Sequence, residues 1–386
     1  MKSVKKGTLV FNILVLLLIT KPIIAQNANP TFCSKGIIEF FKIIDILKQD
    51  KSPTEEDWNQ FNSSPGYKDL TEREFGKNYL RDLMTVAFKP SEQKNKNVII
   101  DKYKNKGDYY MMFAEGTYNS FIESDKYRAD IIDFINYIST PEFIKGVEHY
   151  VSEFISNARF DSTMRINFIV FDDSRGYEQI IIGITNPRKY TIEEESCLKT
   201  IWGSIYFPTM LLMAHESFHN IREKQIKLTD PDPNSGDQRI VEILNSIEDE
   251  GIADQINVSR LYSNEGCLSH SNDAQRIIQE QKYQYAIIHS LDYFLTEISL
   301  NESLKQDLSK TIESIIARSG HPTGDYIAKT IASQLGNEEL KRISLNPFQF
   351  IISYNKAAKA LPGTPQFSET AIDFIKKLET KYLINK

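Results

Sequence analysis

The chain has 386 residues, a formal net charge of −6 and 25% charged residues. This balance excludes the strongly basic surface that nucleic acid or an anionic membrane would require, so we expect neither as a partner. The chain has three cysteines, Cys33, Cys197 and Cys267, which are far apart in the sequence. It is therefore not a small secreted domain built on disulfides, although one disulfide and one free thiol remain possible.

Residues 1–25 are typical of a secretory signal peptide. Lys2, Lys5 and Lys6 precede an apolar run over residues 9–19, and Ala25 offers a small residue for cleavage. The alternative is an uncleaved N-terminal anchor, but the apolar run is short for a membrane span. We therefore expect an exported protein, periplasmic or secreted, with no stable membrane insertion after cleavage.

Helical spacing of apolar residues dominates the chain and predicts a mainly α (α+β) fold. We expect an N-terminal helical region over residues 26–160 and a second region over 161–386 that ends in helices. The predicted helices cover residues 34–48, a segment from 53, and then 70–88, 140–157, 273–300, 302–318, 348–361 and 368–383.

Two short β-branched segments interrupt this helical pattern. Residues 165–171 alternate in polarity, and residues 179–185 are rich in isoleucine, with a turn-like segment between them. They predict two strands, and a hairpin is one way to pair them. The resulting small sheet would lie directly before the helix that carries the main motif.

That helix is predicted around the sequence His215-Glu216-Ser217-Phe218-His219. Residues four apart lie on the same helix face, so both imidazoles can bind one tetrahedral Zn²⁺. Glu216 would then lie beside the metal, where it can accept a proton from water. The alternative is a pair of hydrogen-bonded core histidines, which the burial cost of polar groups disfavours.

Zinc requires a third protein ligand, and the segment 240–254 supplies the candidates. Glu250 and Asp254 continue an apolar helical stripe, where unpaired carboxylates would be costly. Glu248 competes with Glu250 for the same role. We favour Glu250 because Asp254, one turn later, could accept the second imidazole N–H of a ligand histidine. Asp249 falls on another face and is predicted to be solvated.

The combination of His215-Glu216-x-x-His219 with Glu250-x-x-x-Asp254 resembles the gluzincin branch of metallopeptidases, which includes thermolysin-like and aminopeptidase-N-like enzymes. The sequence from Glu250 to Asp254 looks most similar to uncharacterised bacterial families described as zinc-dependent peptidases. The third ligand follows His219 by 31 positions (250 − 219), a longer spacing than in thermolysin-like enzymes. The resemblance implies a zincin-like fold and a peptide or protein substrate.

The resemblance also implies a Tyr or His donor for the oxyanion that forms on the carbonyl. His321 and Tyr326, which flank a predicted helix start, are the candidates. An ordinary interhelical turn with Tyr326 in the core is the alternative. Zincins hold extended peptide on an edge strand, a role that residues 179–185 could fill.

The predicted function is hydrolysis of peptide bonds by zinc-activated water, with Glu216 as general base. The rival interpretation is a catalytically silent zincin-fold protein that binds a peptide, and a non-peptide hydrolase also fits the metal chemistry.

Overall fold

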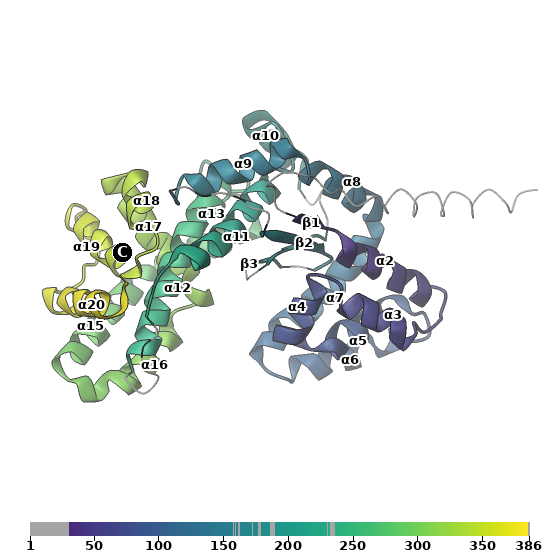
Figure 1. Cartoon of the computed structure of the whole chain (residues 1–386), viewed down its shortest axis with the longest axis horizontal. Helices are drawn as coiled ribbons and strands as arrows, with labels where there is room; N and C mark the ends of the chain where they lie inside the picture. The colour runs from purple at the N-terminus through teal and green to yellow at the C-terminus, as the bar shows by residue number, and fades with distance from the viewer. Residues whose placement is uncertain are drawn as a thin grey trace, which may run out of the picture.

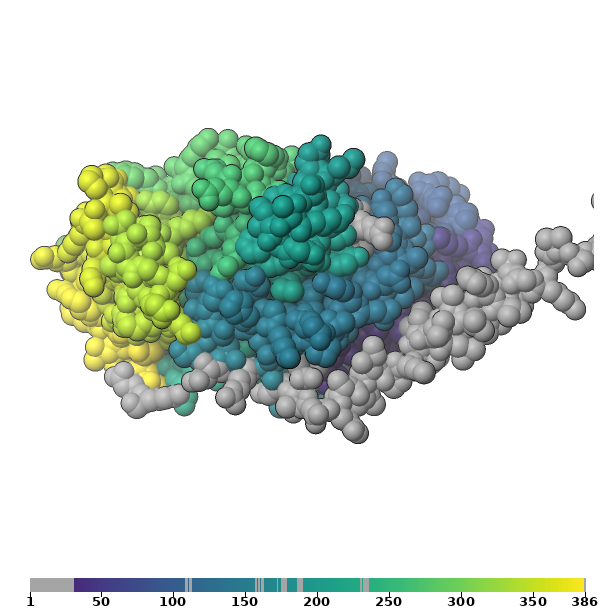
Figure 2. Space-filling view, turned by 90° about the horizontal axis from the view of Figure 1, so that it is seen from above, coloured from purple at the N-terminus to yellow at the C-terminus, as the bar shows by residue number. Residues whose placement is uncertain are grey.

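The computed structural model describes residues 31–384 except 157, 159, 161–162, 172, 177–178, 186–189, 230 and 232–235. The predicted signal peptide lies outside the described residues. No helix among the described residues is long and apolar enough to cross a membrane. The N-terminal and C-terminal helices lie at opposite ends of the molecule (Figures 1 and 2), and a small sheet lies between them (Figure 1).

The first half of the chain is almost wholly helical. Its helices are α2 (Lys35–Leu47), α3 (Glu55–Asn62), α4 (Tyr67–Leu70), η1 (Thr71–Phe75), α5 (Lys77–Phe88), η2 (Gln93–Asn95), α6 (Lys96–Lys104), α7 (Asp108–Lys126), α8 (Arg128–Ile138) and α9 (Pro141–Ser152). Local sequence explains where several of them begin. Thr54 and Asp57 form a capping box at the start of α3, and Thr140 caps α9, which has Pro141 in its first turn.

The second half continues with long helices. They are α10 (Ile192–Trp202), α11 (Phe207–Gln225), α12 (Asp237–Ile256), α13 (Val258–Leu261), α14 (Asn272–Lys282), α15 (Gln284–Leu300), η3 (Glu302–Leu304), α16 (Lys305–Ile315), η4 (Arg318–Gly320), α17 (His321–Leu335), α18 (Asn337–Ile343), α19 (Pro347–Lys359) and α20 (Glu369–Tyr382). The prediction of a mainly helical fold is confirmed. The predicted helix over 70–88 is interrupted at Gly76, where φ is +72°, and the one over 273–300 is interrupted at Tyr283.

The sheet has four strands in the order β1 (Thr31–Cys33), β2 (Arg165–Ile169), β4 (Ile180–Gly183) and β3 (Arg175–Gly176). The hairpin suggested from the sequence is wrong, because β2 pairs with β4 in parallel, with Ile166 opposite Ile180. The two-residue β3 pairs antiparallel with β4 and occupies the edge. β4 is therefore an interior strand, not the edge strand considered from the sequence.

The sheet connects the two halves of the molecule. Helix α2 packs on β2, and α11 packs on β3 and β4. Figure 1 shows α2 and α11 on either side of the sheet. Helix α11 in turn packs against α9 and α12, while α12 packs closely against α17. Three helices from different parts of the second half are thus brought together, and they carry the residues singled out from the sequence. The division near residue 160 stays a prediction.

Candidate metal centre

Helix α11 carries both motif histidines on one buried face. His215 and Glu216 are 5% and 7% exposed, and His219 is partly buried. The two Nε2 atoms of His215 and His219 are 3.0 Å apart, because their Cα atoms are separated by four residues of one helix. The two nitrogens therefore lie close enough together to bind a single metal ion.

Glu250 approaches this point from α12. Its Oε2 atom lies 3.3 Å from Nε2 of His219 and 3.7 Å from Nε2 of His215. All three potential ligand atoms lie within 4.8 Å of one another. The Oε2 atom is buried and has no hydrogen-bond partner among the residues that the structure describes. A buried carboxylate oxygen without a donor is costly, and a cation between it and the two imidazoles would remove that cost.

The outer nitrogens of both histidines are also engaged. Nδ1 of His219 lies 2.7 Å from Oδ1 of Asp249, and Nδ1 of His215 lies 3.2 Å from Oδ1 of Asn257. Hydrogen bonds to Nδ1 fix the tautomer that presents a lone pair at Nε2, the arrangement found at most metal-bound histidines. The prediction that Asp249 is solvated is wrong, since this carboxylate is turned toward α11.

Glu248, the alternative to Glu250, points away from the histidines. It is fully buried and accepts a hydrogen bond from Nε of Arg222 at 2.8 Å. Its other oxygen accepts from the backbone N–H of Leu345 at 3.1 Å. Glu248 is therefore the partner of a buried guanidinium, and the structure brings Glu250 to the imidazole pair instead.

Two glycines allow α17 to lie close to this pair of helices. A Cβ atom on Gly324 would collide with the backbone of Ile247 and with Gly251, the residue after Glu250. The close approach places His321, at the start of α17, beside the ligand candidate. Its Nε2 atom is 3.2 Å from Oε2 of Glu250.

Asp254 holds His321 in this position. Its Oδ2 atom lies 3.0 Å from Nδ1 of His321, whereas its Oδ1 atom is 3.8 Å from Nδ1 of His215. The sequence predicted that Asp254 would orient a ligand histidine. In the structure its hydrogen bond goes to His321, and Asn257 is the hydrogen-bond partner of His215.

Tyr326 lies elsewhere. Its ring packs against that of Tyr354 on α19, with centroids 6.2 Å apart, and burial raises the pKa of its phenol. Its described contacts correspond to the alternative considered from the sequence, in which Tyr326 packs into the core. His321 is thus the oxyanion candidate that the fold brings to the centre.

Comparison with known proteins agrees with this geometry. A family model described as "putative zinc dependent peptidase" (DUF5700) matches residues 58–363, a span that contains α11, α12 and the whole of α17. The chain belongs to this family. No curated protein and no solved structure matches the chain. The resemblance to zinc-dependent peptidases is therefore confirmed at the level of the family.

The electrostatics of this family member's centre favour a cation. Burial lowers the pKa of His215 to about 4, so that this imidazole is neutral at physiological pH. Burial opposes ionisation of Glu250, but the charge of His219 holds the pKa of its carboxyl below its ordinary value. Burial would lower the pKa of His219, but the charges of Asp249 and Glu250 raise it above its ordinary value, so zinc would displace a proton from this second imidazole. Two neutral imidazoles and an ionised carboxylate are then a donor set that Zn²⁺ prefers in catalytic sites. The residues present thus fit the metal that the family name implies.

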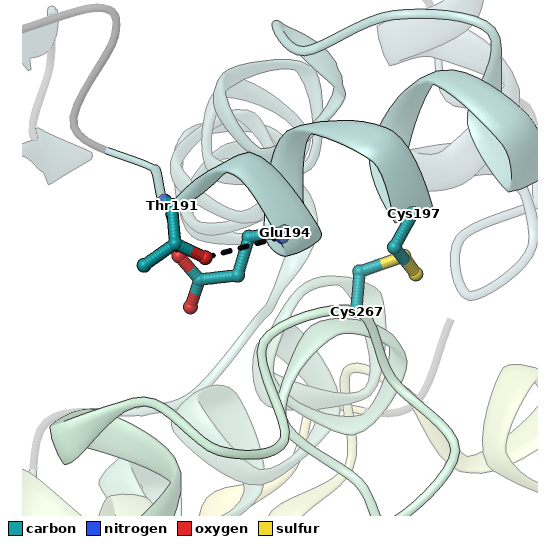
Figure 3. Close-up of a disulfide and its surroundings, with 4 residues drawn as sticks. All are labelled: Thr191, Glu194, Cys197 and Cys267. Atoms are coloured by element: carbon teal, nitrogen blue, oxygen red, sulfur yellow. Dashed lines mark hydrogen bonds between the residues drawn. A yellow bond between two sulfur atoms is a disulfide. The ribbon is translucent and has the colours of Figure 1, made fainter.

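A disulfide joins Cys197 to Cys267 (Figure 3) and closes a loop in the sequence. The sequence left this pairing open, and Cys33 is the free cysteine. Cys197 is on α10, whose start is fixed by a capping box between Thr191 and Glu194, also drawn in Figure 3. The loop contains both motif histidines and Glu250, so the bond ties together the two ends of the segment that builds the centre.

Proposed function

We propose that the chain is a zinc-dependent peptidase whose metal is held by His215, His219 and Glu250. The observation that carries this proposal is the convergence of three ligand atoms, because the buried Oε2 atom of Glu250 lies 3.3 Å and 3.7 Å from the Nε2 atoms of His219 and His215. When bound, zinc would supply the Lewis acid that polarises the scissile carbonyl and acidifies the attacking water.

The chain's own residues would carry the proton transfers. Glu216, beside His215 on α11, would accept the proton of the attacking water and pass it to the departing amine. His321 would donate a hydrogen bond from Nε2 to the developing oxyanion. This role needs the doubly protonated imidazolium, because Nδ1 of His321 already faces Asp254. Burial opposes that form, but the Asp254 carboxylate raises the pKa of His321 above its ordinary value and so favours it.

The same proposal includes the site of action. Residues 1–25 favour export, and the Cys197–Cys267 disulfide is typical of an oxidising compartment. We therefore propose a periplasmic or secreted enzyme that acts on peptides or proteins. Cell fractionation with N-terminal sequencing of the recovered chain tests this, and a chain found only in the cytoplasm with residue 1 intact would contradict it.

The deciding experiment measures zinc content and cleavage in matched variants. We expect about one zinc per wild-type chain and a loss of zinc affinity of at least about a hundredfold in Glu250→Ala. Glu248→Gln is the control, because it changes the neighbouring carboxylate that pairs with Arg222 instead. Glu216→Gln should keep its zinc while cleavage of a peptide library falls by roughly 10²–10⁴-fold.

Two results would contradict the proposal. Wild-type chain that takes up no zinc after reconstitution cannot use this mechanism. If zinc-loaded wild type and Glu216→Gln both bind peptides and neither cleaves them, the chain is the catalytically silent binding protein.

A further inference from the structure

A small cavity lies directly along the helix that carries Glu216. Its volume is about 150 Å³, and its walls come from the end of β4, the first turns of α11 and the segment around α13. None of the described residues that line it carries a charge. Its main apolar and aromatic walls are Phe134, Ile184, Tyr190, Leu212, Leu261 and Tyr262.

The cavity and the proposed base share one face of α11. Thr209 and Leu212 line the cavity, and Glu216 and His219 follow them at offsets of seven and ten residues from Thr209. Offsets of three, seven and ten form one continuous stripe on an α-helix. A peptide that reaches Glu216 along this face therefore passes the cavity.

The separation suits a neighbouring residue of the substrate. Leu212 precedes Glu216 by four residues, which is about 6 Å along the helix axis. An extended peptide advances about 3.4 Å per residue. A side chain one or two residues from the reacting carbonyl would thus be level with the cavity.

A second contact joins the cavity to the candidate metal centre. Asn257 lines the cavity, and its Oδ1 atom accepts a hydrogen bond from Nδ1 of His215 at 3.2 Å. Asn257 therefore both lines the cavity and contacts the imidazole of His215. This shared residue links the cavity directly to the candidate metal centre.

The chemistry of the walls selects against charge. Burial raises the pKa of Tyr262 to about 12 and raises that of Tyr190 as well, so both phenols are neutral. An ionised side chain placed here would find no counter-charge among the described lining residues. A cavity of about 150 Å³ is large enough for a benzene ring. The space therefore fits an uncharged side chain up to the size of phenylalanine.

We infer that this cavity is a specificity pocket that receives an uncharged side chain of the substrate, from leucine to phenylalanine in size, next to the cleaved bond. The inference rests on the proposed peptidase function and names its substrate class: peptides with a medium-sized neutral residue beside the scissile bond. Leu212 lines the pocket on the same face of α11 as Glu216, so we expect its size to decide which side chains fit.

The test compares peptides that differ at one position. Each peptide carries Gly, Leu, Phe, Asp or Lys beside the cleaved bond, and kcat/KM is measured for wild type, Leu212→Phe and Ile201→Phe. Ile201 is the matched control, because it gains the same ring on the exposed side of α10, where 56% of the residue is accessible, and does not line the cavity. Thr209→Leu is a second pocket variant, and melting temperature and zinc content are checked for each protein.

We expect wild type to prefer Leu or Phe over Asp or Lys by about tenfold or more. Leu212→Phe should lower cleavage of the Leu and Phe peptides by about tenfold relative to the Gly peptide, and Ile201→Phe should keep the wild-type preference. Equal cleavage of charged and neutral peptides, or a preference that neither pocket variant changes, overturns the inference but leaves the peptidase proposal standing.

A binding measurement separates the two proposals if wild type cleaves nothing. The same peptides are titrated into zinc-loaded Glu216→Gln by calorimetry. Binding of the Leu and Phe peptides about tenfold tighter than the Asp and Lys peptides, reduced in Leu212→Phe, supports the pocket although peptide hydrolysis has failed. No binding, or binding without preference, overturns the pocket too.

Discussion

The N-terminal helices and the candidate centre bury different kinds of side chain. In the N-terminal half, the fully buried ring of Phe40 packs on those of Phe121, Phe41 and Phe88, with centroids 5.2 to 6.2 Å apart. Such contacts remove apolar surface from water and need no partner of opposite charge.

The centre instead buries ionisable side chains. Arg222, Glu248 and Asp254 are 2%, 0% and 3% exposed, and each has a polar partner among the described residues. Buried ion pairs contribute little net stability, because desolvation offsets their attraction. The difference teaches that the aromatic contacts around Phe40 maintain the fold, while the buried charges of the centre maintain a geometry. Variants in the two halves should therefore separate stability from zinc affinity.

The largest change in stability is expected among the aromatic contacts of the N-terminal helices. Phe40→Ala removes a fully buried ring and leaves a cavity, so the free energy of unfolding should fall by about 4 kcal/mol. Chemical denaturation of the zinc-free protein measures this loss, and Phe40→Leu should lose less. The zinc dissociation constant of the folded variant should stay at the wild-type value, and a parallel loss of zinc affinity would break the comparison.

A somewhat smaller loss of stability is expected from the disulfide that encloses the centre. Cys197→Ser opens a covalent loop with a sequence separation of 70 residues, which should lower the free energy of unfolding by about 3 kcal/mol. Cys33→Ser is the matched control, since Cys33 is free and its replacement should change stability little. Equal unfolding midpoints for the two variants under oxidising conditions would mean that the bond does not constrain the chain.

Much of the helical fold could be predicted, because apolar spacing is a local signal. The sheet could not. β1 has only three residues, too few for a recognisable period, and its parallel partner β2 begins more than 130 positions later. Parallel pairing is set by tertiary packing, so the sequence could indicate strands but not their order.

Parts of the candidate site could be predicted where the residues concerned lie on the same helix. The spacing of His215 and His219, and of Glu250 and Asp254, is a property of a single helix. Asp249 and Asn257 were missed because their role depends on how α12 lies beside α11. Periodicity assigned Asp249 to a polar face but could not reveal that this face meets His219 and Arg222. An acidic residue directly before the predicted ligand is the one signal that could have indicated it.

The smallest effect is expected at Asp249, the carboxylate whose role the sequence did not reveal. Asp249→Asn keeps the size of the side chain but removes the charge that faces Nδ1 of His219. Loss of such a partner should weaken zinc binding by about 10–100-fold at about pH 8, measured by competition with a chelator. Glu248→Gln is the control, because it removes the adjacent buried charge without touching a histidine.

The pH dependence of this effect distinguishes an electrostatic role from general loosening of the site. Burial would lower the pKa of His219, but the charges of Asp249 and Glu250 hold it well above its ordinary value. In zinc-free wild type a proton therefore occupies His219 up to that raised pKa, and zinc must displace it, so zinc affinity falls as the pH is lowered. Asp249→Asn lowers the pKa of His219, and proton competition then begins at a lower pH. The difference in zinc affinity between wild type and Asp249→Asn should consequently shrink from about pH 8 to about pH 6. A constant difference across this range would mean that Asp249 supports the site only by packing.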